Sequence, residues 1–198
     1  MTILICGLGS IGQRHLRILK SLGVNDFVAL RSGKGKSIKG DSHVNEISDL
    51  KELTGIKVNG ALITNPTSLH IDTAIEIASL GIPLFIEKPL GNSLEKSDEL
   101  KKITGDKNTP VLMGYNLLYH PCIEAIKKFI TEGKIGKAIS ARSQFGTYMP
   151  DWHKDEDYKK SYAARVTLGG GVILTSIHEQ NYLTDFFERE YQGCQINF

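Results

Sequence analysis

The 198-residue sequence has no long apolar run and little net charge. None of its hydrophobic stretches approaches the roughly 20 residues that a membrane-spanning helix needs, so we expect no membrane partner. The start of the chain has no basic n-region, and its apolar run is too short for a secretory signal peptide. A net charge of +2 gives no reason to expect a nucleic-acid partner.

Cysteine and histidine are both sparse. Cys6, Cys122 and Cys194 are scattered, with no C-x-x-C spacing. An odd, dispersed set argues against a disulfide framework and favours a reducing, cytoplasmic location. The six histidines show no metal-ligand spacing, so no metal site is expected. The remaining composition, 40% hydrophobic and 23% charged, is typical of a globular chain with one large or two small domains.

Strand and helix patterns alternate through the first 117 residues. Short apolar runs predict strands, and apolar residues spaced three and four apart predict helices. Strands are expected at Thr2–Cys6, Phe27–Leu30, Ala61–Thr64, Leu84–Ile86 and Val111–Gly114. Helices are expected at Ile11–Leu22, Ser68–Leu80 and Leu94–Ile103. This alternation predicts an α/β fold, a doubly wound parallel sheet with right-handed crossovers.

Residues 118–198 lack this alternation and are expected to form a second, partial domain. The expected elements are, in order, a helix from Pro121 to about Thr131, a strand over Ala138–Phe145, a loop over Thr147–Tyr162, and a short helix near His178 after Gly169–Gly171.

A glycine-rich turn, Gly7-Leu8-Gly9-Ser10-Ile11-Gly12, joins the first strand to the first helix. Gly7 permits the tight turn, Gly9 lets the backbone approach a pyrophosphate, and Gly12 lets helix and strand pack closely. The helix start adds unpaired N–H groups and a positive dipole end. A plain glycine turn is the alternative. The flanking strand and helix favour a dinucleotide site, with cofactor contacts at Gly7, Gly9, Ser10, Ile11 and Gly12.

The end of the second strand bears on the choice of nucleotide. NAD-specific sites usually carry Asp or Glu about 20 residues beyond the fingerprint, where it binds the ribose 2′-hydroxyl. This chain has Arg31 and Ser32 there, at the start of the basic segment 32–40. An arginine can hold a 2′-phosphate by paired hydrogen bonds, so NADP(H) is favoured over NAD(H). A solvated basic loop, with Arg31 pointing away, is the alternative.

Further motifs follow in a fixed order: Thr64-Asn65-Pro66 with His70, Glu87-Lys88-Pro89, Gly114-Tyr115-Asn116, His120-Pro121, Gly133-Lys134-Ile135-Gly136, and Gly169-Gly170-Gly171 with His178. With the fingerprint and His15, this ordered set resembles the glucose–fructose oxidoreductase / inositol dehydrogenase (Gfo/Idh/MocA) family over residues 1 to about 183. The resemblance implies a Rossmann domain over residues 1–117. It also implies an incomplete α+β domain over residues 118–198, with an open, mostly antiparallel sheet that can pair copies into a homo-oligomer.

The resemblance implies roles for individual residues. Lys88, before a typically cis Lys–Pro peptide, is the acid/base at the reacting oxygen. His178 is its partner, and a structural histidine is the alternative. The residues implied along the cofactor are Thr64, Asn65, Pro66, His70, Glu87, Lys88 and Asn116. The residues implied or expected around the substrate are Lys88, Tyr115, Tyr148, Trp152, Arg165 and His178. An aromatic platform suits a sugar face, although these side chains could equally cover the sheet.

Two departures accompany the resemblance. Leu174 and Asn181 stand where many family members carry aspartates around the catalytic histidine. Family members usually run well past 300 residues, so the resemblance implies a C-terminally shortened chain. The implied function is an NAD(P)-dependent oxidoreductase of a sugar, amino sugar or cyclitol-like alcohol or ketone. The stretch around Tyr148 resembles a subset associated with bacterial surface-sugar biosynthesis. The alternatives are a nucleotide-binding remnant or sensor, and an interaction module.

Overall fold

A six-stranded parallel sheet is the centre of the computed structural model, which describes residues 1–33, 41–152 and 157–187. The strand order is β3-β2-β1-β4-β5-β6. The strands are β1 (Thr2–Cys6), β2 (Asp26–Leu30), β3 (Val44–Ile47), β4 (Val58–Ile63), β5 (Leu84–Ile86) and β6 (Val111–Met113). Every neighbouring pair is parallel, which confirms the predicted doubly wound α/β fold.

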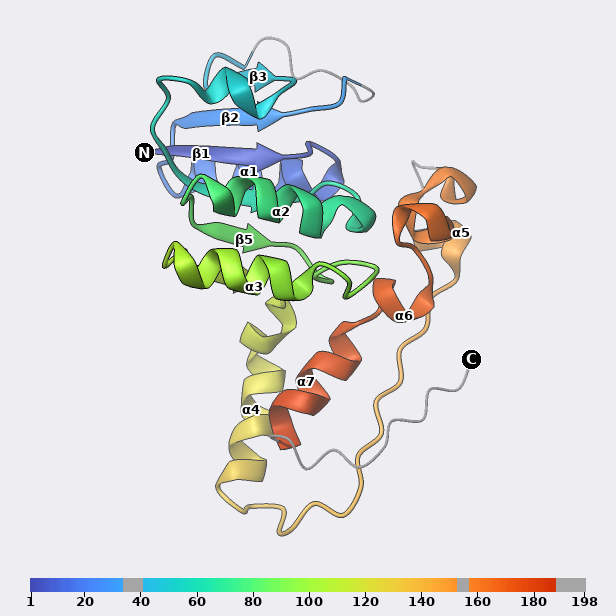
Figure 1. The fold of residues 1–198 in the computed structure, drawn as a ribbon. Helices are drawn as coiled ribbons and strands as arrows, with labels where there is room; N and C mark the ends of the chain where they lie inside the picture. Colours follow the sequence, from blue (N-terminus) through green and yellow to red (C-terminus); the bar gives the residue numbers. More distant parts are fainter. Residues whose placement is uncertain (34–40, 153–156, 188–198) are drawn as a thin grey trace.

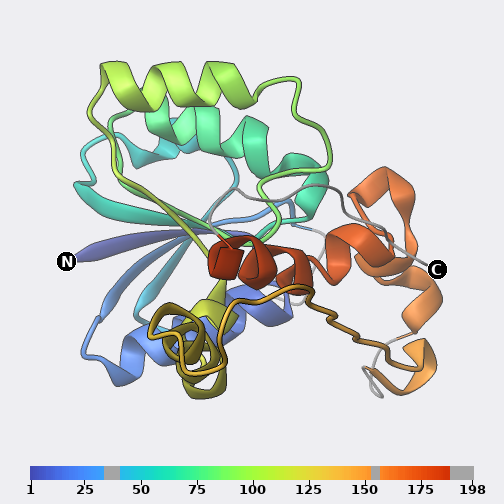
Figure 2. The ribbon, with the colours of Figure 1, turned by 90° about the horizontal axis from the view of Figure 1, so that it is seen from below.

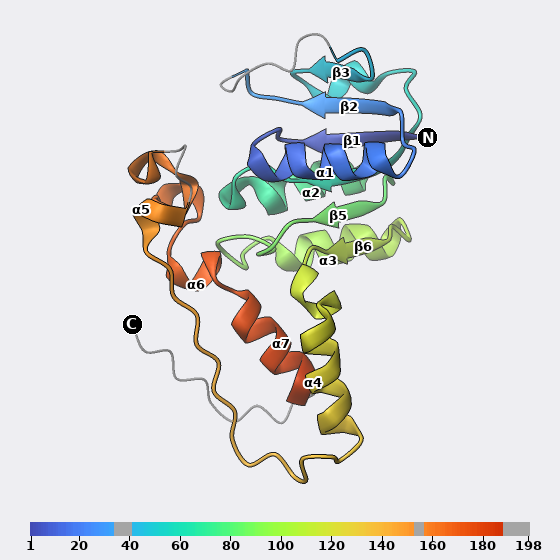
Figure 3. The ribbon, with the colours of Figure 1, turned by 180° about the vertical axis from the view of Figure 1, so that it is seen from behind.

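Helices cover both faces of this sheet. α1 (Ser10–Ser21) lies on one face, and α2 (His70–Ser79) and α3 (Ser97–Asp106) lie on the other (Figures 1 and 3). Alternate residues of β1 supply the two cores: Leu4 packs in the cluster that includes Ala74 and Ile77 of α2, and Ile5 in the cluster with Leu16 of α1. A strand buried on both faces reads as a continuous apolar run, which is why β1 could be predicted to the residue.

β3 is the strand that the sequence did not predict. It has four residues, of which only Ile47 is buried, and it pairs with β2 alone at the edge of the sheet. A short, half-exposed edge strand gives little apolar pattern, so pairing with β2 defines it more than its own residues do.

The later part of the chain is helical and lies at the side of the sheet. α4 (Pro121–Thr131) begins and ends where predicted, and the ring of His120 accepts a hydrogen bond from the Cys122 amide at its start. α7 (His178–Phe187) packs beside α4. α5 (Met149–Trp152) and α6 (Val172–Thr175) lie beyond the carboxyl ends of the strands (Figure 2). Single 3-10 turns lie at Leu50–Leu53, Thr67–Leu69, Asn116–Tyr119, Tyr158–Lys160, Tyr162–Ala164 and Val166–Leu168.

The predicted strand over Ala138–Phe145 is wrong. The segment makes no ladder, and within the described ranges no strand follows β6. Ile139 is 96% exposed, as expected for an extended segment with no neighbouring strand to bond to. The described part of residues 118–198 therefore holds helices and turns in place of the expected antiparallel sheet. No helix among the described residues is long and apolar enough to cross a membrane.

Candidate active site

A pocket of about 870 Å³ opens at the carboxyl ends of the central strands. The strand order reverses between β1 and β4, and open parallel sheets bind ligands at this switch point. The wall combines the turn after β1, the loop after β4 and the loop after β5 with residues from the later part of the chain. The predicted residues that line it are Gly7, Gly9, Ser10, Ile11, Arg31, Ser32, Thr64, Asn65, Pro66, His70, Glu87, Lys88, Tyr115, Asn116 and His178.

The three fingerprint glycines differ in the space around them, in a way that is compatible with the separate functions predicted for them. Gly7 has a φ of 96°, and a Cβ there would lie 2.8 Å from the backbone of Asn65. A Cβ on Gly12 would lie 2.1 Å from the Gly7 carbonyl oxygen, so Gly12 serves helix packing and does not line the pocket. A Cβ on Gly9 would meet nothing within 4 Å. The backbone at Gly9 is therefore open to a ligand.

The start of α1 and two nearby polar atoms fit a bound dinucleotide. Gly9 caps α1 without a side-chain hydrogen bond, which leaves the first amides of the helix to face the pocket as an anion site. Asn65 Oδ1 and His178 Nδ1 are buried and have no hydrogen-bond partner within the described ranges. Both residues line the pocket, where the hydroxyl and amide groups of a nucleotide could satisfy them.

Arg31 lies in the pocket wall, but its guanidinium is engaged. Its Nη1 donates to Glu46 Oε1 at 2.8 Å, and its side chain is only 9% exposed. Glu46 belongs to the unpredicted strand β3. A carboxylate therefore lies beside the arginine that the sequence suggests for a 2′-phosphate, and the sequence alone did not reveal it. Lys34 and Lys36 of the basic segment lie outside the described residues.

Lys88 follows β5 and reaches across the pocket to the later part of the chain. Its Nζ donates to the Thr175 carbonyl oxygen at 2.8 Å, and the Lys88–Pro89 peptide is cis, as the resemblance implies. Burial lowers the pKa of the Lys88 amine, against the opposing charges of Glu87 and Glu179. A half-buried amine with a lowered pKa is suited to general acid/base work.

His178, the first residue of α7, completes this side of the pocket. Burial, and then the positive charge of Lys88, lower its pKa below the ordinary histidine value. Its ring packs edge-on against Tyr115, with the ring centres 6.4 Å apart. Burial also raises the pKa of the Tyr115 phenol, which keeps that hydroxyl protonated as a hydrogen-bond donor.

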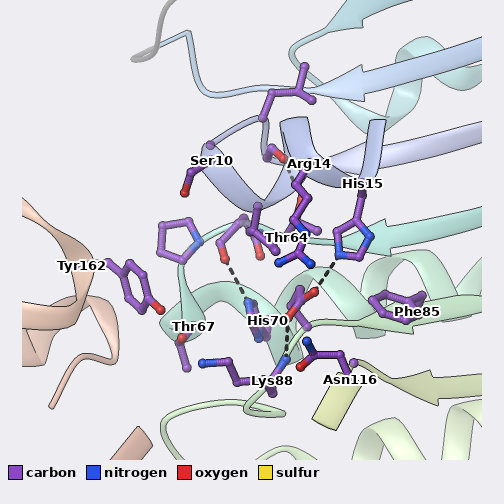
Figure 4. Close-up of a pocket in the computed structure, with 18 of the residues that line it drawn as sticks. Ser10, Arg14, His15, Thr64, Thr67, His70, Phe85, Lys88, Asn116 and Tyr162 are labelled. Atoms are coloured by element: carbon purple, nitrogen blue, oxygen red, sulfur yellow. Dashed lines mark hydrogen bonds and ion pairs between the residues drawn. The ribbon is translucent and has the colours of Figure 1, made fainter. Parts of the chain in front are cut away.

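The side chain of Glu87 is held from α1. His15 Nε2 lies 2.6 Å from Glu87 Oε1, and the His15 ring packs edge-on against Phe85 (Figure 4). Arg14 lines the same wall. Sequence reasoning quoted His15 only as a matching motif and missed Arg14. The signal was available, because Ile11, Arg14, His15 and Ile18 follow the i, i+3, i+4, i+7 spacing of one helix face.

Known proteins resemble this chain in sequence and fold. The model of the oxidoreductase family with an NAD-binding Rossmann fold, Gfo/Idh/MocA, matches residues 1–115. The chain belongs to this family. It is 33% identical over 115 residues to a levoglucosan dehydrogenase of Pseudarthrobacter phenanthrenivorans, covering 58% of this chain and 29% of that protein. It is 24% identical over 137 residues to an inositol 2-dehydrogenase of Rhizobium meliloti, covering 67% and 41%.

A solved structure extends the likeness of fold beyond the Rossmann part. An NAD-binding protein from Listeria innocua superposes with a TM-score of 0.72 at 18% identity, covering 94% of this chain and 55% of that one. The chain thus spans about half the length of that protein, and less than half of the two curated relatives. The Gfo/Idh/MocA relatives catalyse their reactions as whole proteins, so the same reactions are proposals for this chain.

The predicted substrate residues divide into two groups. Tyr115, Lys88 and His178 come together in the pocket, and Tyr162 joins them from a 3-10 turn (Figure 4). Tyr148 is 71% exposed and Arg165 is also exposed, and neither lines the pocket. Tyr148 directly precedes α5, and Arg165 directly precedes the 3-10 turn Val166–Leu168. The backbone of Trp152 ends α5, while its side chain lies outside the described residues.

Proposed function

We propose that this Gfo/Idh/MocA chain is an NAD(P)-dependent oxidoreductase acting on a sugar, amino sugar or cyclitol-like alcohol or ketone. The observation that carries the proposal is the position of Lys88. Its half-buried amine shares one pocket with the open backbone of the glycine fingerprint and with His178. A dinucleotide on the fingerprint and an acid/base at the end of β5 are the two parts that hydride transfer to or from a carbinol carbon requires.

Lys88, with His178 as its partner, transfers the proton of this reaction. A bound nicotinamide supplies or accepts the hydride. During alcohol oxidation, neutral Lys88 accepts the hydroxyl proton while the C–H bond breaks, and during reduction the ammonium returns that proton to the oxygen. The lowered pKa of Lys88 increases its neutral fraction near neutral pH. The Thr175 carbonyl accepts one N–H of Lys88 and orients the others.

The substrate class is supported by the chemistry of the wall and by the relatives. Tyr115, Tyr162 and His178 present ring faces and polar tips, a combination that suits a polyol. The names of the two curated relatives specify an anhydrosugar and a cyclitol. A role in bacterial surface-sugar biosynthesis remains the narrower version of the proposal.

NADP(H) is the proposed cofactor form. Arg31 and Ser32 line the pocket at the end of β2 where NAD-specific sites usually place a carboxylate. The Glu46 carboxylate beside Arg31 reduces the positive potential there, so we expect a modest preference.

A cofactor titration followed by turnover assays tests the proposal. NADPH and NADH fluorescence would be titrated with the 198-residue chain, and nicotinamide absorbance followed with levoglucosan, xylose and myo-inositol as probes. We expect saturable binding, tighter for NADPH, and turnover that Lys88→Met reduces by at least about a hundredfold while changing NADPH binding far less. Lys96→Met, at an exposed lysine paired with Asp72, is the control. Binding without turnover on any polyol would favour the sensor alternative, and no binding by a folded chain would contradict both.

A further inference from the structure

His70 is an enclosed polar side chain at the junction of the two functional loops. It is the first residue of α2 and is 2% exposed. Its Nδ1 lies 2.7 Å from the Pro89 carbonyl oxygen, and its Nε2 lies 2.9 Å from the Asn65 carbonyl oxygen. Both ring nitrogens therefore face backbone carbonyls, which leaves neither for direct contact with a ligand.

The two carbonyls belong to the loops that the proposed reaction depends on. Asn65 follows β4 and lines the pocket, and its buried Oδ1 has no hydrogen-bond partner within the described ranges. Pro89 directly follows Lys88 after β5. Figure 4 shows His70 between the Thr64 side of the pocket and Lys88. A single imidazole thus joins the end of one strand to the end of its neighbour.

The number of N–H groups on the His70 ring determines how many of the two carbonyls it can bond. A neutral ring has one N–H and can donate to one of the two carbonyls, whereas an imidazolium can donate to both. Burial lowers the pKa of His70, and the surrounding carbonyls and the charge of Glu87 oppose that effect. A ring with both N–H groups bonds the two loops at once, and a ring with one N–H bonds one loop while its other nitrogen lies against the second.

We propose that His70 is a positioning residue that holds the cofactor loop at Asn65 and the base of Lys88 in register. The inference rests on the proposed function, because it assigns the Asn65 loop to the cofactor and Lys88 to proton transfer. Thr175 fixes the tip of the Lys88 side chain and His70 fixes its backbone, so the amine is oriented from both ends.

Two conservative variants separate the two contacts. In His70→Asn, the side-chain amide takes the place of Nδ1 and can keep the Pro89 contact, while the Asn65 contact is lost. In His70→Gln, the amide reaches the place of Nε2 and can keep the Asn65 contact, while the Pro89 contact is lost. His43→Asn is the matched control, because His43 is exposed and bonds the Asn25 carbonyl far from the pocket.

Two measurements report on the two loops separately. The first is the dissociation constant of NADPH. The second is the pH dependence with which fluorodinitrobenzene modifies Lys88, read by mass spectrometry of the Lys88 peptide, and it needs no turnover. We expect His70→Asn to weaken NADPH binding about tenfold and leave Lys88 titration unchanged. We expect His70→Gln to move the pKa of Lys88 up toward the ordinary lysine value and change NADPH binding less than about threefold.

The crossed pattern supports a positioning function. Equal changes of both readouts in both variants, or no change in either, would overturn the inference and leave His70 a general packing residue. If the wild type binds neither NADPH nor NADH, the proposed function fails, and the Lys88 labelling of the two variants still decides the inference. Should both variants unfold, the ring ¹⁵N signals of wild-type His70 decide. A slowly exchanging ring N–H supports it, and titration with the ordinary histidine pKa contradicts it.

Discussion

Residues 1–115 and residues 116–187 differ in how many hydrophobic side chains they bury. Among the described residues, every buried hydrophobic side chain except Ala163 and Phe186 lies in the first region. α2 buries Ile71, Ala74, Ile77 and Ala78 against the sheet, whereas α4, one residue longer, buries none. Both helices have an apolar face in sequence. The difference shows that an amphipathic pattern forms a helix, while burial requires a surface to receive it.

The pocket joins these two regions. The side proposed to bind the cofactor, from the fingerprint to Lys88, rests on the doubly packed sheet, and the side proposed to bind the substrate carries Tyr162 and His178 from the thinly packed region. Polar contacts join the sides, chiefly the hydrogen bond from Lys88 to Thr175. We therefore expect the cofactor side to be preformed and the substrate side to be the more adaptable.

The largest expected effect tests the packing contrast directly. Ile63→Ala, at a fully buried position of β4, should lower the free energy of unfolding by about 4 kcal/mol, because it removes core contacts and leaves a cavity. Ile126→Ala on α4, where the side chain is 44% exposed, should change it by less than about 0.5 kcal/mol. Urea denaturation followed by circular dichroism measures both. Comparable losses would break the comparison, because α4 would then be buried in solution.

Within the first region, two glycines separate folding from binding. Gly12→Ala should cost about 2 kcal/mol of stability, because its Cβ would lie 2.1 Å from the Gly7 carbonyl oxygen. Gly9→Ala should leave stability within about 0.5 kcal/mol, because its Cβ meets nothing. We expect Gly9→Ala to weaken NADPH binding by blocking the approach of the pyrophosphate. Urea denaturation and an NADPH titration of each variant check this, and a stable Gly12→Ala protein would refute it.

Acid should loosen the junction of the two regions. The folded-state pKa of His178 lies below its ordinary value of 6.5, through burial and the charge of Lys88. Its contribution to stability is therefore present above pH 6.5 and is lost as the pH falls through the lower folded-state pKa. His178→Gln cannot take up this proton. Between pH 7 and pH 5 the wild type should lose more unfolding free energy than His178→Gln, and parallel pH profiles would contradict the assigned cause.

The Rossmann sheet could be predicted from the sequence because each of its buried strands carries its own signal. β1, β5 and α4 begin and end where predicted, since continuous apolar runs and a proline at the first helical turn are local features. The sequence missed the strand β3 and predicted a strand over residues 138–145 that does not form, and both errors have one cause. Pairing with β2, which no local pattern encodes, makes β3 a strand. Residues 138–145 have no such neighbour and stay outside the sheet.

The same limit applies to the candidate site. Lys88, His178 and the fingerprint come together as the ordered motifs predict. The partners that tune them do not follow from any motif: Glu46 reaches Arg31 through β3, His15 reaches Glu87 across 72 residues, and Thr175 offers only a backbone carbonyl. Long-range contacts of this kind depend on the packed fold.

The smallest expected effect concerns the Arg31–Glu46 pair at the edge of the first region. Glu46→Gln removes the negative charge 2.8 Å from the Arg31 guanidinium but keeps a hydrogen-bond acceptor there. The potential at the predicted 2′-phosphate position becomes more positive, so NADPH affinity should rise about threefold while NADH affinity stays constant. Parallel NADPH and NADH titrations at low and high salt measure the ratio, and salt should reduce the gain. An equal change for both cofactors would place the 2′-phosphate away from Arg31, and the preference for NADP(H) would lose its structural basis.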